Sequence, residues 1–341
     1  MALRLCTPSK WTVKGWCAMH VVVIGAGRGL IQTLKAVRPV ATQLTVVTPS
    51  CAHSTPDALI RRLGGFVAAT QAFQVLHQFG GDAQMHRLWG QRFASLGTPY
   101  DGVPFGVLHL LAHAQQLGSM QEALALLQQQ IRCNIDVLLV SETVHDVLLH
   151  QSNGEVVRHQ PGQRITGVTQ AELAPEVPVN PVVVRALRVA QLVVIAPGSL
   201  YTTVLPTLLP IGMAETLRSM TAQVVCVAPL TTVAGQTDAF RCVDYVARVA
   251  RAIGRGGLNT ALVNNAPYST AHRTVLAKHG LAPLVTTASD GDIVQALGVR
   301  LVARDFLMLD GAPERTLGQL TTHHETELRM GCVQASRPAQ P

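Results

Sequence analysis

The chain has 341 residues, of which 48% are hydrophobic and 14% charged, so it can fill the core of one large domain or two ordinary ones. Its net charge of +7 comes from basic residues scattered along the chain, and only 4% of the residues are aromatic. Nucleic-acid-binding surfaces usually cluster Lys and Arg and often interleave aromatic residues, so the composition argues against a nucleic-acid partner.

The N-terminus and the cysteines indicate a cytoplasmic protein. Residues 1–18 include basic residues but no apolar core of a signal peptide, so we predict a short N-terminal extension. The seven cysteines are widely spaced and form no C-x-x-C pair. An odd number at such spacing is typical of reduced thiols, not of a disulfide framework or a zinc site.

Short apolar runs without alternation predict strands that are buried on both faces. These runs are residues 20–24, 44–48, 137–141, 192–196, 224–228 and 260–264. Helical patterns lie between several of them, at residues 30–37, 213–220, 242–253 and 271–279. Strands that alternate with helices predict an α/β protein with a Rossmann-like, doubly wound and mainly parallel sheet.

Three segments depart from this alternation. Residues 57–130 hold Ala-, Leu- and Gln-rich helical patterns without a strand signal, so we predict a helical lobe at one edge of the sheet, not crossover helices between strands. Residues 142–167 alternate like a hairpin whose turn is Ser152-Asn153-Gly154. We expect residues 19–321 to form a single domain and the polar residues 322–341 to be a disordered tail, with His323 and His324 in solvent.

A long uncharged segment extends from Gln191 to Ala214. A membrane span needs about 20 continuous apolar residues, whereas prolines and glycines interrupt this segment at short intervals. They are Pro197, Gly198, Pro206, Pro210 and Gly212. We therefore predict a buried strand followed by a polar loop, and no membrane span.

A glycine-rich turn follows the first predicted strand, with Gly25, Gly27 and Gly29 spaced as G-x-G-x-G around Arg28. Such a turn leaves backbone N–H groups free at a helix N-terminus, where an anion is favoured. The turn lacks the last glycine of the dinucleotide fingerprint, and the first 56 residues contain no acid to bind a ribose, which argues against NAD. A phosphate site and a plain strand–helix turn both remain open.

The loop after the strand at 192–196 supplies hydroxyls at the edge of the sheet where ligands bind in open α/β folds. We expect Pro197 and Gly198 to let the backbone approach a ligand, Ser199 and Thr202 to donate to phosphate or sugar oxygens, and Tyr201 to stack on a base or sugar. Ser199 lacks the G-x-S-x-G setting of a nucleophile. A simple capping turn is the alternative.

Two further polar groups are candidates. The loop at 231–238 contains Thr237 and Asp238, and Asp238 either caps the following helix or faces the cleft. His109 and His113 are four residues apart in a helical pattern and share a face, but two histidines make an incomplete metal site.

Three segments resemble the gluconeogenesis-factor (YvcK) and 2-phospho-L-lactate transferase (CofD) superfamily. They are VVVIGAGRGLIQTLKAV from Val21, LVVIAPGSLYTTVLPTLLPIGMAETL from Leu192, and GQTDAFRCVDYV from Gly235. Their order and spacing match over roughly residues 19–320, and the PGSLYTxxLP block is the most specific part. The segment Val263-Asn264-Asn265 falls where relatives have similar residues, so the resemblance adds Asn264 to the ligand-binding candidates.

The chain also departs from that family pattern. Relatives have an acidic loop after their second strand, whereas residues 49–55 contain no acid, and the Glu of their Gly-Glu-Thr-Asp motif is Gln236 here. Metal and phosphate chemistry needs anionic oxygen ligands, so these losses weigh against phosphotransfer. We expect no metal, no cofactor and no catalytic residue.

The resemblance implies two different functions. The gluconeogenesis-factor branch resembles a nucleotide-sugar-binding regulator of cell-wall precursor supply and cell shape, and a binding role survives the lost acids better. The transferase branch implies a phosphorylated substrate, a deazaflavin acceptor and a divalent metal. We expect a regulator that binds a UDP-sugar or another phosphorylated small molecule. An enzyme of deazaflavin cofactor biosynthesis and a degenerate, non-binding paralogue are the alternatives, and homo-oligomerisation is left open.

Overall fold

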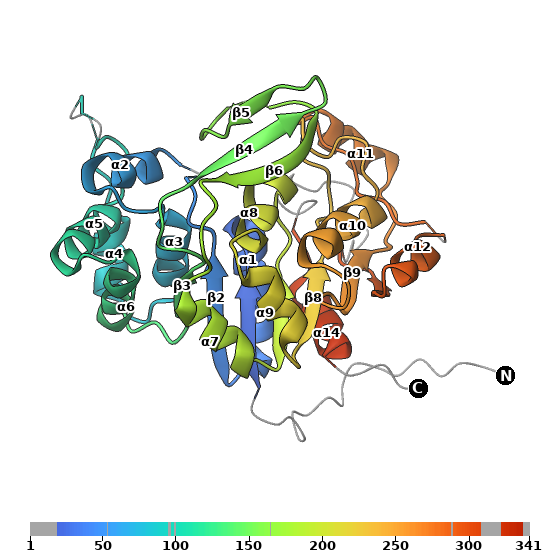
Figure 1. The fold of residues 1–341 in the computed structure, drawn as a ribbon, viewed down its shortest axis with the longest axis horizontal. Coiled ribbons are helices and arrows are strands. Elements are labelled where there is room, and N and C mark those ends of the chain that lie inside the picture. The colour runs from blue at the N-terminus through green and yellow to red at the C-terminus, as the bar shows by residue number, and fades with distance from the viewer. Residues whose placement is uncertain are drawn as a thin grey trace.

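The main sheet has seven parallel strands in the order β10-β9-β8-β7-β1-β2-β3 (Figure 1). The structure, a computed structural model, describes residues 19–52, 54–94, 97–98, 100–163, 165–287, 289–307 and 322–336. The predicted extension at 1–18 lies outside the described residues. The strands are β1 (His20–Ile24), β2 (Gln43–Thr48), β3 (Asp136–Leu139), β7 (Leu192–Ile195), β8 (Gln223–Val227), β9 (Thr260–Asn264) and β10 (Arg300–Arg304). The predicted mainly parallel α/β fold is confirmed.

Strand β1 lies at the centre of the sheet and pairs with β2 on one side and β7 on the other. Its side chains alternate between two hydrophobic cores: Val21 and Val23 point into one, and Val22 and Ile24 into the other. Because both faces are covered, the strand is apolar at every position after His20. His20 itself is buried and bonds Thr45 across the sheet at 2.9 Å.

Helices cover both faces of the sheet (Figure 1). Helices α1 (Gly27–Val37) and α14 (Glu325–Ala335) contribute to the core that contains Val21 and Val23. The opposite core is covered by α7 (Pro181–Val189), α9 (Met213–Ser219) and α10 (Cys242–Ile253). The remaining helices outside the lobe are η2 (Arg38–Val40), α11 (Thr270–Ala277) and α12 (Asp290–Ala296), together with two short ones after β7.

The helical lobe lies beyond the β3 edge, at the left of Figure 1. It consists of α2 (Thr55–Gly64), α3 (Thr70–Phe79), α4 (Ala83–Gly90), α5 (Phe105–Leu117) and α6 (Met120–Gln130). These helices also connect β2 to β3, which are adjacent and parallel, so the expectation that they are not a crossover is wrong. Parallel neighbours need a long connection, and here that connection is the whole lobe.

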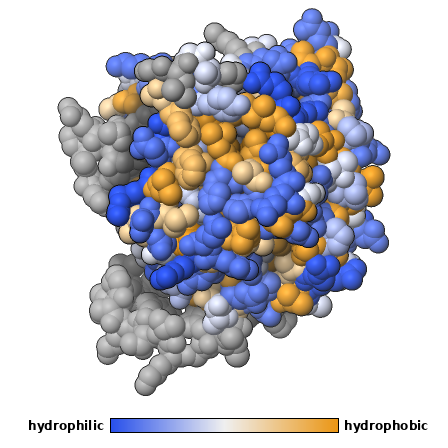
Figure 2. Space-filling model, turned by 90° about the vertical axis from the view of Figure 1, so that its left-hand side faces the viewer, coloured by the Kyte–Doolittle hydropathy of each residue, from blue (hydrophilic) through white to orange (hydrophobic). Residues whose placement is uncertain are grey.

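The lobe shares the hydrophobic core that contains Val21 and Val23, and its outer surface is mixed. Trp89 is fully buried, and its ring lies 5.8 Å from that of Phe73. Figure 2, which views the molecule from the side of the lobe, shows apolar patches among polar residues. Three large apolar side chains of the lobe remain partly exposed: Leu63 by 39%, Leu88 by 47% and Leu117 by 42%.

A second, antiparallel sheet has the order β5-β4-β6. Strands β4 (Asp146–Gln151) and β5 (Val156–Arg158) form the predicted hairpin around residues 152–154. The third strand, β6 (Val168–Ala174), is absent from the sequence-based prediction. It packs against the segment that follows β7, so the small sheet sits next to the loops at the carboxyl end of the main sheet.

The uncharged segment from Gln191 to Ala214 is strand β7, a loop, a π-helical turn η3 (Leu200–Val204) and the short helix α8 (Leu205–Leu208). The buried strand β7 and the loop that follows it agree with the sequence-based prediction. No helix in the described part of the chain is both long enough and apolar enough to cross a membrane.

The C-terminal segment corrects another expectation. Residues 325–335, predicted to be part of a disordered tail, form α14 and pack against α1. Leu328 and Cys332 are fully buried on one side of this helix, and Arg329 donates to the carbonyl of Ala36 at 2.9 Å. The segment looks polar because its solvent side is charged, while a few apolar residues at helical spacing suffice to dock it.

Candidate functional site

A cavity of about 380 Å³ opens where the loops after β1 and β7 meet. From β1 the chain runs to β2 on one side, whereas the chain leaving β7 runs to β8 on the other. Ligands in open α/β sheets bind in the crevice that forms at such a switch point. The size of the cavity also falls within the usual range for small-molecule sites.

The glycine turn forms one wall of the cavity. Gly25 donates its N–H to the carbonyl of Val47 at 3.0 Å, and a Cβ on it would lie 3.0 Å from that of Ala196. Gly27 has a φ of +66°, the left-handed region that favours glycine. Gly29 is packed so closely that a Cβ would lie 1.9 Å from the carbonyl oxygen of Pro197. The glycines therefore shape the junction between the two loops.

The same wall is electropositive. It is the N-terminus of α1, whose helix dipole places partial positive charge at the cavity. The N-cap residue is Ala26, which has no side chain to cap the first turn. Arg28 is exposed and lines the cavity, whereas the N–H of Gly27 is bonded to the side-chain oxygen of Gln71 at 2.9 Å.

The opposite wall is the loop after β7. Ser199 lines the cavity, donates to the side-chain oxygen of Gln236 at 2.7 Å and accepts from Thr202 at 2.7 Å. The Tyr245 hydroxyl donates to the carbonyl of Gly198 at 3.1 Å. Burial raises the pKa of Tyr245 well above its usual value, so the hydroxyl stays protonated and keeps donating. The loop is therefore positioned by hydrogen bonds from α10 and from the 231–238 loop.

A third wall comes from the loop after β8. Thr231 and Thr232 line the cavity. Thr232 is fixed by two bonds to Ala282, one from its own N–H at 2.8 Å and one to its hydroxyl at 2.9 Å. The carbonyl of Leu230 accepts from the N–H of Leu284 at 3.0 Å. The third wall therefore contributes two threonines to the cavity lining.

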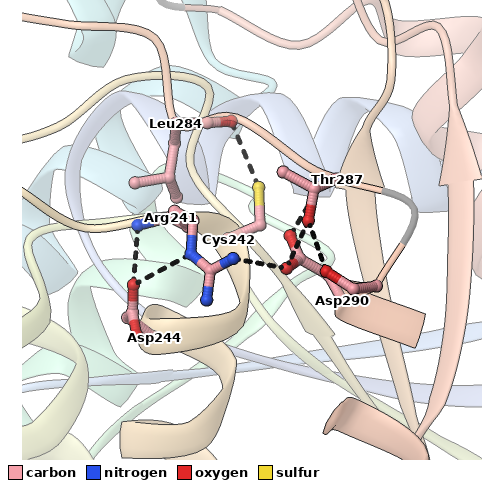
Figure 3. Close-up of polar contacts among 7 residues, drawn as sticks. Arg241, Cys242, Asp244, Leu284, Thr287 and Asp290 are labelled. Atoms are coloured by element: carbon pink, nitrogen blue, oxygen red, sulfur yellow. Dashed lines mark hydrogen bonds and ion pairs between the residues drawn. The ribbon is translucent and has the colours of Figure 1, made fainter. Parts of the chain in front are cut away.

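The segment that supports this third wall is itself clamped to α10 (Figure 3). The thiol of Cys242 donates to the carbonyl of Leu284 at 3.2 Å, and burial raises the thiol pKa to about 11. Arg241 forms an ion pair with the buried Asp290 at 3.2 Å. Asp290 also accepts from the N–H and hydroxyl of Thr287, at 2.9 and 2.8 Å. These contacts hold Leu284, Thr287 and Asp290 against the start of α10.

His323 completes the site from the C-terminal segment. The expectation that His323 lies in solvent is wrong, because the side chain is only 4% exposed. It packs against Phe306, and its ring bonds the carbonyl of Ala228 at 3.0 Å. Burial lowers the pKa of His323 to about 4, so the ring is neutral at neutral pH. A neutral ring bonded to a carbonyl must donate from Nε2.

The structure brings half of the predicted site residues together. Six of the twelve line the cavity: Gly27, Arg28, Gly29, Pro197, Gly198 and Ser199. Tyr201 and Thr202 do not line it, because the π-helical turn places them inside the protein, where Tyr201 is 1% exposed. This position does not suit the expected stacking of Tyr201 on a ligand. Gly25 does not line the cavity, although the next two residues do.

The side chains of the other three predicted residues bond nearby backbone groups and do not line the cavity. Thr237 accepts from the N–H of Val233 at 2.8 Å, and Asp238 accepts from the N–H of Gly235 at 3.0 and 2.8 Å. Neither alternative for Asp238 is observed, because the N-cap of α10 is Arg241, paired with Asp244, and Asp238 does not line the cavity. Asn264 is buried and bridges the carbonyl of Ala266 to the N–H of Phe306, both at 3.0 Å.

Sequence reasoning missed several lining residues. Gln32 comes from the helical part of the segment that begins at Val21, Gln71 comes from a helical pattern with no motif, and Thr322 and His323 come from the segment expected to be disordered. The hydroxyls of Thr231 and Thr232 could have been found, since they follow a buried strand directly. Gln71 and His323 carry no such signal, because their segments reach the cavity only through tertiary packing.

The residues present do not fit a divalent metal of the kind that phosphotransfer uses. None of the described residues that line the cavity is an acid, and such ions take carboxylate oxygens. Among the described residues, no group of three or more His, Cys, Asp or Glu is placed to hold a metal ion. His109 and His113 lie on α5 with their Nε2 atoms 2.9 Å apart, away from the cavity.

The chain is similar in sequence to proteins named gluconeogenesis factor. It is 27% identical over 291 residues to a gluconeogenesis factor of Listeria innocua, covering 84% of this chain and 88% of that protein. It is 25% identical over 296 residues to a gluconeogenesis factor of Halalkalibacterium halodurans, covering 85% and 90%. A crystal structure of a UPF0052-family protein from Bacillus halodurans has the same fold, with a TM-score of 0.81 at 22% identity, covering 94% of this chain and all of that one.

The family model described as 2-phospho-L-lactate transferase CofD matches residues 21–307, from the second residue of β1 to three residues past β10. The matched region contains all three walls of the cavity apart from Thr322 and His323. The chain therefore belongs to the CofD family.

Proposed function

We propose that this protein binds a phosphorylated small molecule of the nucleotide-sugar class in the cavity between the loops after β1 and β7. The observation that carries the proposal is the distribution of charge and hydroxyls around that cavity. The N-terminus of α1 and Arg28 lie on one side, Ser199, Thr231 and Thr232 lie on the others, and no described lining residue is an acid.

This arrangement suits the two ends of such a ligand. Phosphate oxygens are stabilised by backbone N–H groups at a helix N-terminus and by a guanidinium. Sugar hydroxyls both donate and accept, and threonine and serine hydroxyls can match them in either role. The neutral loop after β7 would let an anionic group approach without repulsion.

The relatives named gluconeogenesis factor support a regulatory role for the bound state. We propose that the protein acts as a regulator of that type, linked to cell-wall precursor supply and cell shape. Binding alone would suffice for this role, so the absence of acids from the described cavity lining does not weigh against it.

A transferase is the second candidate, because the matching family model is described as a 2-phospho-L-lactate transferase. Its implied divalent metal has no carboxylate ligands among the described residues of the cavity. We therefore rank it below the regulator.

A thermal-shift screen with UDP-sugars, GDP, GTP and a deazaflavin tests the proposal. A ligand at 100 times its dissociation constant should stabilise the protein by about 2.7 kcal/mol. We expect a UDP-sugar to do so, and Arg28→Gln to reduce the shift. Arg255→Gln removes the same charge from an exposed position that does not line the cavity and should leave the shift unchanged. No shift with any nucleotide-sugar would contradict the proposal, and a shift with deazaflavin plus GDP would favour the transferase.

A further inference from the structure

One hydrogen bond joins the helical lobe to the head of α1. The side-chain oxygen of Gln71, in the first turn of α3, accepts from the N–H of Gly27 at 2.9 Å. The two residues are 44 positions apart, and both line the cavity. Since Ala26 has no capping side chain, α3 of the lobe supplies a cap for α1 from outside that helix.

The bonded N–H is one that an anion would need. Backbone N–H groups in the first turn of a helix are the donors that hold a phosphate at a helix N-terminus. The oxygen of a neutral amide is a weaker acceptor than an anionic oxygen, because charge-assisted hydrogen bonds are roughly twice as strong. An anion that enters the cavity therefore competes with Gln71 for Gly27, and has the advantage.

We propose that Gln71 is a placeholder for the anionic group of the ligand. Its side-chain oxygen occupies the N–H of Gly27 in the free protein and leaves it when an anion binds. This inference rests on the proposed function, since it requires an anion at the N-terminus of α1. It adds that ligand binding breaks a contact between α1 and the lobe.

The position of Gln71 makes the lobe responsive to that change. The neighbouring Thr70 donates its N–H to Asp57 at 3.0 Å, and its hydroxyl bonds Ser54 at 3.1 Å, so the start of α3 is tied to α2. Ala72 and Phe73 are buried in the lobe. Release of Gln71 thus removes one of the contacts of α3, a helix that also packs against β3 of the main sheet and against α4, α5 and α6.

Two substitutions at Gln71 and one matched control test the proposal. Gln71→Ala removes the competing oxygen, and Gln71→Glu replaces it with a built-in anion of the same length. Gln74→Ala makes the same change three residues later on α3, at an exposed position that does not line this cavity. The probes are inorganic pyrophosphate and UDP-glucose, titrated by calorimetry, with the thermal midpoint of each ligand-free variant as a second readout.

We expect Gln71→Ala to bind pyrophosphate about 2- to 10-fold more tightly than Gln74→Ala, the ratio that corresponds to losing one competing hydrogen bond. Gln71→Glu should bind both probes at least about 10-fold more weakly, because the carboxylate takes Gly27 and repels the ligand. Without ligand, Gln71→Glu should raise the thermal midpoint at pH 7, since an anion is stabilising at a helix N-terminus. That gain should disappear at low pH, when the carboxylate is protonated.

The outcomes separate the two proposals. If the parent and Gln74→Ala bind neither probe, the proposed function fails, and the thermal midpoint of Gln71→Glu alone decides whether this N–H prefers an anion. If they bind a probe but Gln71→Ala binds it equally well, the placeholder is refuted while the proposed function stands. Weaker binding by Gln71→Ala would also refute it, because Gln71 would then contact the ligand directly.

Discussion

Gly29 lies directly against Pro197, so that a Cβ on the glycine would come within 1.9 Å of the proline carbonyl oxygen. Gly29 belongs to the first turn of α1, and Pro197 to the loop after β7. The obstacle is backbone, which cannot swing aside as a flexible side chain can. This contact holds the two main walls of the cavity at their present separation.

Gly29→Ala should therefore lower the free energy of unfolding by about 1–3 kcal/mol, the usual cost of an overpacked position, and weaken ligand binding. The opposite sign is expected for Gly291→Ala in α12, where a Cβ would meet nothing within 4 Å. There alanine should stabilise the helix by up to about 1 kcal/mol. Urea denaturation of both variants checks the pair, and equal effects would show that the contact imposes no strain.

Gly198→Asp should abolish ligand binding while the protein stays folded. A Cβ at Gly198 would have Val204 as its nearest neighbour, at an ordinary 3.5 Å, so the fold has room for it. The added carboxylate, at a residue that lines the cavity, would repel an anion. Calorimetric titration with the ligand from the screen, together with circular dichroism, tests this, and Gly198→Ala separates bulk from charge. Parent-like binding by Gly198→Asp would mean that the ligand site lies elsewhere.

Ser199→Ala should cost about 0.5–3 kcal/mol of binding free energy, the range for one lost hydrogen bond, with the upper end for a charged partner. The hydroxyl lies between Gln236 and Thr202, so its loss also leaves the hydroxyl of Thr202 without its acceptor. The measurement is again calorimetric. Ser219→Ala, at the end of α9 and away from the cavity, should bind like the parent.

Acid should destabilise the protein through His323. Burial lowers its pKa in the folded state to about 4, below the usual histidine value of about 6.5, so only the unfolded state takes up a proton between these values. Stability is therefore fully retained above pH 6.5 and falls as the pH drops toward 4. Each pH unit is worth about 1.4 kcal/mol, so the total loss from this residue is about 3 kcal/mol.

Urea denaturation at pH 7.5, 6 and 5 tests this dependence. His323→Gln keeps a donor near the Ala228 carbonyl but removes the titrating ring, so its stability should change less with pH than that of the parent. Burial also lowers the pKa values of His145 and His159, so a smaller slope of the same sign should remain. Identical slopes in the two proteins would contradict the assignment to His323.

Leu328→Ala should lower the free energy of unfolding by about 2–5 kcal/mol, as expected for a fully buried leucine. Thr326→Ala, on the exposed side of the same helix, should change it by less than about 0.5 kcal/mol. Denaturant titration distinguishes the two. A negligible effect of Leu328→Ala would mean that α14 is not part of the folded core in solution.

Six of the seven main strands are predictable from the sequence because they read as short apolar runs, even though β3, at the edge of the sheet, is fully buried only at alternate positions. Strand β10 is not, because this edge strand begins with Arg300 and ends with Arg304, and only Val302 within it is buried. Helix α14 is missed for a related reason: its charged side dominates the composition, although Leu328 and Cys332 dock it.

The candidate site is predictable only in outline. The rule that ligands bind at the carboxyl ends of parallel strands locates the glycine turn and the loop at Ser199. It cannot foresee that Gln71 reaches the turn from a lobe helix, because nothing in a helical pattern records which distant backbone group a side chain meets. Nor can it foresee that a π-helical turn directs Tyr201 inward.

The central position of β1 has a consequence for synthesis on the ribosome. Strand β2 can pair with one edge of β1 early in synthesis. The other edge stays unpaired until β7 is made, about 170 residues later along the chain. Until then a nearly all-apolar strand presents open hydrogen-bonding groups, the kind of edge that invites aggregation. A fragment that ends before Leu192 would keep the lobe and lack the partner of β1. We expect such a fragment to require a chaperone or to precipitate, so this protein cannot be divided into two autonomous halves at the small antiparallel sheet.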